Sequence, residues 1–68
     1  MIIFKNLEGA TIVINPDIIL VASMSAEGYL CLEYSQDKGQ VALNPVDYAE
    51  GTLKKVFDEI CKGGAFID

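Results

Sequence analysis

The sequence contains no histidine, no arginine and no tryptophan, and it holds only five basic residues against ten acidic ones. Without histidine, the chain lacks the usual general base near neutral pH and the commonest metal ligand. Without arginine, it lacks the planar group that grips phosphate and guanine with two hydrogen bonds. The net charge of −5 also argues against a groove for nucleic acid. We therefore expect no enzyme, no metal or cofactor, and no nucleic-acid partner.

Long hydrophobic runs are also absent. The longest one, Ile18 to Ala22, is far shorter than the roughly 20 residues that span a membrane. The N-terminus has no sustained apolar stretch and no small-residue cleavage site of the kind found in a secretory signal. We expect no membrane insertion and, by default, a cytoplasmic location.

Cysteine is scarce, with only Cys31 and Cys61, each among apolar neighbours. Two thiols in a reduced compartment usually behave as small buried hydrophobes, so we expect free thiols, and a Cys31–Cys61 bridge is the alternative. Two cysteines without histidine do not make an ordinary zinc site.

The chain is 51% hydrophobic over 68 residues, which is enough for one small domain, residues 1–68. Short apolar or alternating runs, separated by turns, predict strands at about 1–5, 10–14, 18–24, 29–34 and 40–43. Spacing this close favours antiparallel pairing. We expect an α+β fold with a meander sheet of about five strands, flat or curled into a partial barrel, and one C-terminal helix.

That helix is predicted at about 52–62 by apolar residues at helical spacing: Leu53, Val56, Phe57, Ile60 and Cys61. We expect Thr52 to cap it and Gly63-Gly64 to end it, although Asn44 followed by Pro45 would allow an earlier start. Spacing on the polar face predicts Lys55–Glu59 and Asp58–Lys62 ion pairs.

Two segments resemble each other, Asn15-Pro16-Asp17 and Asn44-Pro45-Val46-Asp47, and each follows a predicted strand. Asn and Pro at these positions are typical of turns that end a strand. The functional alternative is a pair of acidic turns that together bind a cation or a peptide. We favour the turn interpretation.

The strands carry more apolar side chains than one helix can cover, since Ile18 to Ala22 is apolar on both faces. A domain this small is also marginally stable as an isolated monomer. We therefore predict a homo-oligomer or a module that binds a protein partner through a sheet face or edge. The alternative is a regulatory domain that holds a small apolar ligand inside a curled sheet. The predicted contact residues are Ile12, Ile14, Ile19, Val21, Tyr29 and Cys31, and the sequence leaves open which parity faces outward.

The first hairpin carries Ile2-Ile3, then Leu7-Glu8-Gly9, then Ile12-Val13-Ile14-Asn15-Pro16-Asp17-Ile18-Ile19. This arrangement resembles the small FlbD/SwrD-type flagellar and swarming-motility proteins over about the first twenty residues. The chain departs from that pattern at Glu8, where the family usually has Asn, and at Leu20, where it usually has an acidic residue. The resemblance implies a cytoplasmic, non-catalytic accessory protein of motility and carries no active-site residues.

Overall fold

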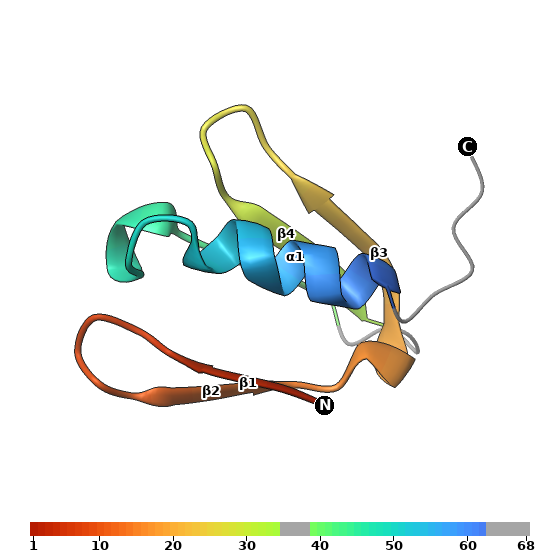
Figure 1. Cartoon of the computed structure of the whole chain (residues 1–68). Coiled ribbons are helices and arrows are strands. Elements are labelled where there is room, and N and C mark those ends of the chain that lie inside the picture. The colour runs from red at the N-terminus through yellow and green to blue at the C-terminus, as the bar shows by residue number, and fades with distance from the viewer. Residues whose placement is uncertain (35–38, 63–68) are drawn as a thin grey trace.

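The computed structural model describes residues 1–34 and 39–62, which form five strands, two 3-10 turns and one α-helix (Figure 1). All five strands and the helix begin and end within one residue of the ranges expected from the sequence. Residues 35–38, between the fourth and fifth predicted strands, and the predicted helix stop at Gly63-Gly64 lie outside the described residues. The elements are β1 (Ile2–Lys5), β2 (Thr11–Ile14), η1 (Pro16–Ile18), β3 (Ile19–Met24), β4 (Leu30–Tyr34), β5 (Gln40–Leu43), η2 (Pro45–Asp47) and α1 (Thr52–Lys62).

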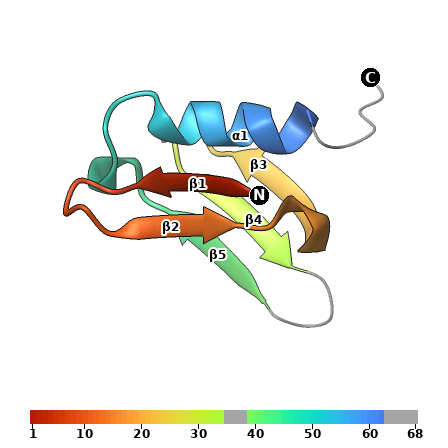
Figure 2. The ribbon, with the colours of Figure 1, turned by 60° about the horizontal axis from the view of Figure 1, so that its bottom comes forward.

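The strands form two separate antiparallel sheets. β1 and β2 make a hairpin, and β3, β4 and β5 make a three-stranded meander. Figure 2 shows the hairpin in front of the three-stranded sheet, with α1 running beside β1. The α+β class with antiparallel pairing and one C-terminal helix is confirmed. The prediction of one meander sheet of about five strands, flat or curled into a partial barrel, is wrong, because the strands form two sheets.

The chain between β2 and β3 explains the separation of the sheets. Asp17 N–H donates to Asn15 Oδ1 at 3.0 Å, and Ile18 N–H donates to the Asn15 carbonyl at 3.3 Å. Ile19 N–H donates to the Pro16 carbonyl. Pro16 itself has no backbone N–H to donate to a neighbouring strand. The backbone donors that would start a β2–β3 hairpin are therefore used inside the turn, and β3 leaves to join β4 instead.

The second Asn-Pro segment folds as the same turn. Val46 N–H donates to Asn44 Oδ1 at 3.0 Å, and Tyr48 N–H donates to the Pro45 carbonyl at 3.3 Å. The two turns lie at opposite ends of the molecule (Figures 1 and 2), so their acidic residues do not form a common site. The sequence echo therefore reflects turn chemistry, as the favoured interpretation predicts.

The start of α1 is set by Gly51, not by Thr52. The first α-helical hydrogen bond runs from Lys55 N–H to the Gly51 carbonyl at 3.1 Å, so Gly51 occupies the cap position. Its φ of +85° suits glycine, which has no side chain to clash there. An earlier start at Asn44 does not occur because η2 and Gly51 interrupt the chain.

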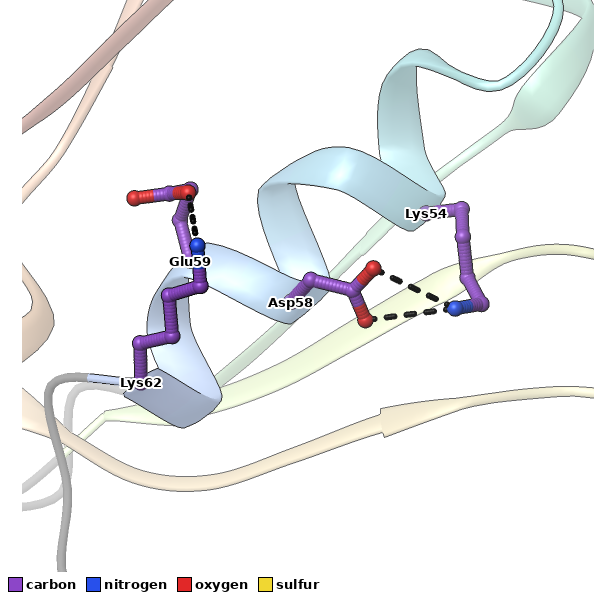
Figure 3. Close-up of polar contacts among 4 residues, drawn as sticks. All are labelled: Lys54, Asp58, Glu59 and Lys62. Atoms are coloured by element: carbon purple, nitrogen blue, oxygen red, sulfur yellow. Dashed lines mark hydrogen bonds and ion pairs between the residues drawn. The ribbon is translucent and has the colours of Figure 1, made fainter.

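The polar face of α1 forms different ion pairs from those predicted (Figure 3). Lys54 Nζ lies 3.2 Å from Asp58 Oδ1, and Lys62 Nζ lies 3.4 Å from Glu59 Oε2. The acidic residues are those of the prediction, but their partners differ. Asp58 pairs with Lys54 instead of Lys62, and Glu59 pairs with Lys62 instead of Lys55. Since these groups are largely exposed, each pair contributes well under about 1 kcal/mol.

One core joins the hairpin, the sheet and the helix. Leu30 and Leu32 of β4 are fully enclosed at its centre, with 0% and 1% of their surface exposed. Ile14 of β2 packs on them from one side, and Leu53 and Val56 of α1 pack from another. The helix therefore covers the same core as the inner face of the hairpin, and the two sheets share one apolar interior.

Replacing either Asn15 or Asn44 with alanine should destabilise the protein by about 1 kcal/mol, because the Asn side chain satisfies a backbone N–H at the start of its turn. Urea unfolding of each variant measures the loss. Asn15→Asp and Asn44→Asp keep the acceptor oxygen and serve as controls. An alanine variant as stable as its aspartate control would contradict the role of the side chain.

Candidate interaction surface

The side of the β1–β2 hairpin that faces away from the core carries an exposed pair of aliphatic side chains. Register places Ile3 opposite Val13 and Lys5 opposite Thr11. All four are exposed, with 64% of Ile3 and 53% of Val13 open to solvent. We call these four residues the hairpin outer face. Ile3 and Val13 give it an apolar centre.

Local geometry brings the Ile3 and Val13 side chains close together. Asn6 N–H donates to the Ala10 carbonyl at 3.0 Å at the closed end of the hairpin. Hydrogen-bonded and non-hydrogen-bonded pairs alternate along an antiparallel ladder, so Ile3 and Val13 form a non-hydrogen-bonded pair. Side chains stand closest at such positions. The pair is therefore one continuous apolar surface.

Three of the predicted contact residues point inward. Ile14 is 5% exposed and belongs to the core. Ile12 and Ile19 are half-buried and pack against that core. These three side chains support the hairpin and the sheet from inside and do not contribute to the hairpin outer face.

The other three predicted residues lie on or beside the outer face of the three-stranded sheet. Val21 is 49% exposed, and it lines a shallow depression of about 380 Å³ together with Cys31. Tyr29 is half-buried and directly precedes β4. The structure therefore brings Val21 and Cys31 together. It separates them from the inward-facing Ile12, Ile14 and Ile19.

A β-bulge accounts for the separation of Ile19 from Val21. The two residues share a parity in the sequence and were expected on one face, but the β3–β4 register shifts between them. The shift turns Ile19 toward the core and Val21 toward solvent. An inserted residue of this kind reverses the alternation of a strand. Nothing in the surrounding apolar run marks its position.

Sequence reasoning missed Ile3 and Val13 as surface residues, although a signal was available. Ile3 and Val13 share their parity with two polar residues, Lys5 and Thr11, whereas the opposite parity of both strands is entirely apolar. In a two-stranded hairpin with one buried side, the parity that contains polar residues faces solvent. That rule assigns the outer face correctly.

The described residues present no cluster of metal-ligating side chains. Over 1–34 and 39–62, no three acidic or cysteine residues are grouped to hold a metal ion. Cys31 and Cys61 are both half-buried free thiols, not a disulfide. Leu30 and Leu32 fill the centre of the core, which is the position that an apolar ligand inside a curled sheet would occupy. Within the same described residues, no helix has the length and apolar character needed to cross a membrane.

The closed end of the hairpin is attached to the segment after β5. Leu7 N–H donates to the Asp47 carbonyl at 2.8 Å, and the rings of Phe4 and Tyr48 pack at an angle with centroids 5.7 Å apart. Tyr48 is 8% exposed. Its burial, and secondarily the nearby Asp47 carboxylate, raise its pKa above 10.0. These contacts hold the hairpin against the core and leave its outer face free.

The raised pKa of Tyr48 predicts a loss of stability in alkali. Folding favours the neutral phenol, so its contribution is complete below the ordinary tyrosine pKa of about 10 and falls as pH rises through the higher pKa of the folded state. The free energy of unfolding, measured with urea as a function of pH, should fall more steeply above about pH 10 for the wild type than for Tyr48→Phe. Equal slopes would contradict the assignment to Tyr48.

Comparison with protein-family models, with curated proteins and with solved structures finds no match to this chain.

Proposed function

We propose that this chain is a small non-catalytic interaction module that self-associates through the hairpin outer face. The observation that carries the proposal is the opposed Ile3–Val13 pair, which is more than half exposed on a hairpin whose inner side packs on the core. Contiguous exposed apolar side chains on a small protein are typical of interaction surfaces. In a two-fold symmetric dimer, the Ile3–Val13 pair of one copy would pack on the same pair of the other copy.

The distribution of charge supports a second copy of the chain as the partner. Within residues 1–14 the only charged side chains are Lys5 and Glu8, so this segment is neutral while the whole chain carries −5. Two copies that meet at their hairpins therefore keep most of their acidic residues away from the contact. Approach through a face that carries several acidic residues would bring like charges together, which is unfavourable.

The energetics indicate how large the contact must be. Full burial of an Ile or Val side chain contributes about 1.5–3 kcal/mol, and these two are a little over half exposed, so a dimer gains about 3.5–7 kcal/mol from four such side chains. Association itself costs about 4–15 kcal/mol. The contact must therefore include further exposed apolar side chains such as Met1, which directly precedes β1 and is 82% exposed. We expect weak association.

The resemblance of the first twenty residues to the FlbD/SwrD-type proteins extends the proposal to a cytoplasmic accessory role in motility. That role requires no catalysis, and it fits an acidic chain without histidine or arginine. A protein partner could occupy the same hairpin outer face in place of the second copy.

Val13→Glu should shift the protein toward monomer by about tenfold in dissociation constant, because it places a charge at the centre of the contact. Analytical ultracentrifugation across a concentration series measures the shift. Val46→Glu is the matched control, since Val46 is 72% exposed and lies in η2, outside the hairpin outer face. Circular dichroism checks that both variants fold.

A wild-type chain that stays monomeric up to millimolar concentration would rule out self-association. Equal weakening by Val13→Glu and Val46→Glu would rule out the hairpin outer face as the contact.

A further inference from the structure

The edge of β1 that faces away from β2 carries backbone hydrogen-bonding groups without partners. Ile3 and Val13 form a non-hydrogen-bonded pair, and Lys5 and Thr11 form the next one. The N–H and C=O groups of Ile3 and Lys5 therefore point away from β2. Within the part of the chain that the structure describes, none of these groups has a hydrogen-bond partner. We call the N–H and C=O groups of Ile3 and Lys5 the β1 edge.

The chain already bonds to this side of the hairpin just beyond β1. Leu7 has the same parity as Ile3 and Lys5, and its N–H donates to the Asp47 carbonyl at 2.8 Å. A segment from outside the hairpin therefore pairs with the chain where β1 ends, and the pairing stops there. The two residues of the β1 edge remain open to a further strand.

A groove runs between the β1 edge and α1. Its walls are residues 2–4 of β1 and, on α1, Thr52, Lys55, Val56 and Glu59. Side chains of consecutive strand residues alternate between the two faces, so residues 2–4 share only their backbone edge. Figure 2 shows α1 beside β1 along this side of the hairpin. A strand that entered the groove would therefore meet the β1 edge and α1 together.

The size of the groove and its hydrogen-bonding groups indicate a polypeptide as the occupant. The groove holds about 220 Å³, which is below the range of about 300–1,000 Å³ for small-ligand sites. Val56, which is only 4% exposed, gives it an apolar base. The alternating donors and acceptors of the β1 edge match the backbone of an extended chain, which is how open strand edges bind peptides.

The charges at the groove favour an acidic occupant. Lys55 lines the groove and Lys5 ends β1, and among the described residues neither lysine has an ion-pair partner. β1 and α1 run in opposite directions (Figure 2), so Lys5 lies toward the first turn of α1, which contains Lys55. Glu59 is farther along α1 and is paired with Lys62. One end of the groove is therefore positive, although the whole chain carries −5.

We propose that the β1 edge binds an extended acidic polypeptide segment, which adds as a strand antiparallel to β1 and packs against α1. Successive residues of the segment then lie opposite Lys5, Phe4 and Ile3. An acidic side chain is favoured opposite Lys5, because directly opposed side chains of unlike charge attract each other. The next side chain lies on the same side as Phe4, toward Val56, and is aliphatic. The third lies beside the exposed Ile3, where a β-branched side chain packs well.

The probe is the peptide Ser-Thr-Glu-Val-Val-Thr-Ser, blocked at both ends, whose glutamate and two valines fit these three positions. Amide hydrogen exchange of the full chain, followed by NMR with and without saturating peptide, measures strand addition. The Ile3 and Lys5 amides should exchange about tenfold more slowly with peptide, because each gains an acceptor. The Phe4 amide, which already bonds to β2, should change much less. Binding without protection of Ile3 and Lys5, or no binding up to millimolar concentration, would overturn the proposal.

Two N-methylated forms of the peptide test the pairing itself. The N–H of the second valine, opposite Ile3, points toward β1, so its methylation should weaken binding about tenfold. The N–H of the first valine, opposite Phe4, points away from β1, and its methylation is the matched control with a much smaller effect. Equal losses from the two methylations would overturn the antiparallel strand.

Variants of the lysines test the preference for an acidic segment. Lys5→Gln and Lys55→Gln should each weaken the peptide about twofold to fivefold, the range for one partner of an exposed ion pair. Lys54→Gln is the matched control, because Lys54 adjoins Lys55 but pairs with Asp58 and does not line the groove. A peptide with glutamine in place of glutamate should bind all three variants as it binds the wild type. Equal weakening of the glutamate peptide by Lys54→Gln and Lys55→Gln would overturn the acidic preference.

A second copy of the chain is the competing occupant of the β1 edge. Pairing of two β1 edges would protect the Ile3 and Lys5 amides as the protein concentration rises without peptide, and that result would overturn the proposal. The peptide experiments use a protein concentration at which ultracentrifugation shows a monomer. Self-association through the hairpin outer face and strand addition at the β1 edge therefore succeed or fail separately.

Discussion

The hydrogen bonds of η1 are the constraint on which the rest of the structure depends. Because Asn15 and Pro16 capture or remove the backbone donors between β2 and β3, the first two strands cannot continue into the sheet formed by the other three. The hairpin instead packs its inner face on Leu30 and Leu32, which places three elements around one core. A chain of this length has no other apolar interior to share.

Separation of the hairpin has a direct consequence for its surface. One side of β1 and β2 is covered by the core, while the bond from Leu7 to the Asp47 carbonyl and the packing of Phe4 on Tyr48 hold the hairpin in place. The opposite side has nothing over it among the described residues, so the Ile3–Val13 pair remains in solvent. Of the apolar strand side chains that one helix cannot cover, some are therefore buried in the core and others remain exposed on the hairpin.

The segment after β5 holds the hairpin in position. Tyr48 supports the hairpin with its ring, which packs at an angle on that of Phe4. Gly51 then ends the irregular segment and starts α1 without a capping side chain. A short stretch of chain between β5 and α1 therefore fixes the hairpin and sets the start of the helix.

Local patterns determined the elements of this protein: alternating and apolar runs located the strands, the helical spacing of Leu53 and Val56 located α1, and Asn-Pro located both turns. The parity of Lys5 and Thr11 also indicated which side of the hairpin faces solvent. Only the tertiary structure decided that the strands divide into two sheets, that Ile19 and Val21 face opposite ways, and that Tyr48 packs on Phe4 of the hairpin. Those outcomes depend on hydrogen bonds and packing between segments distant in sequence, and on a bulge whose position an apolar run does not record.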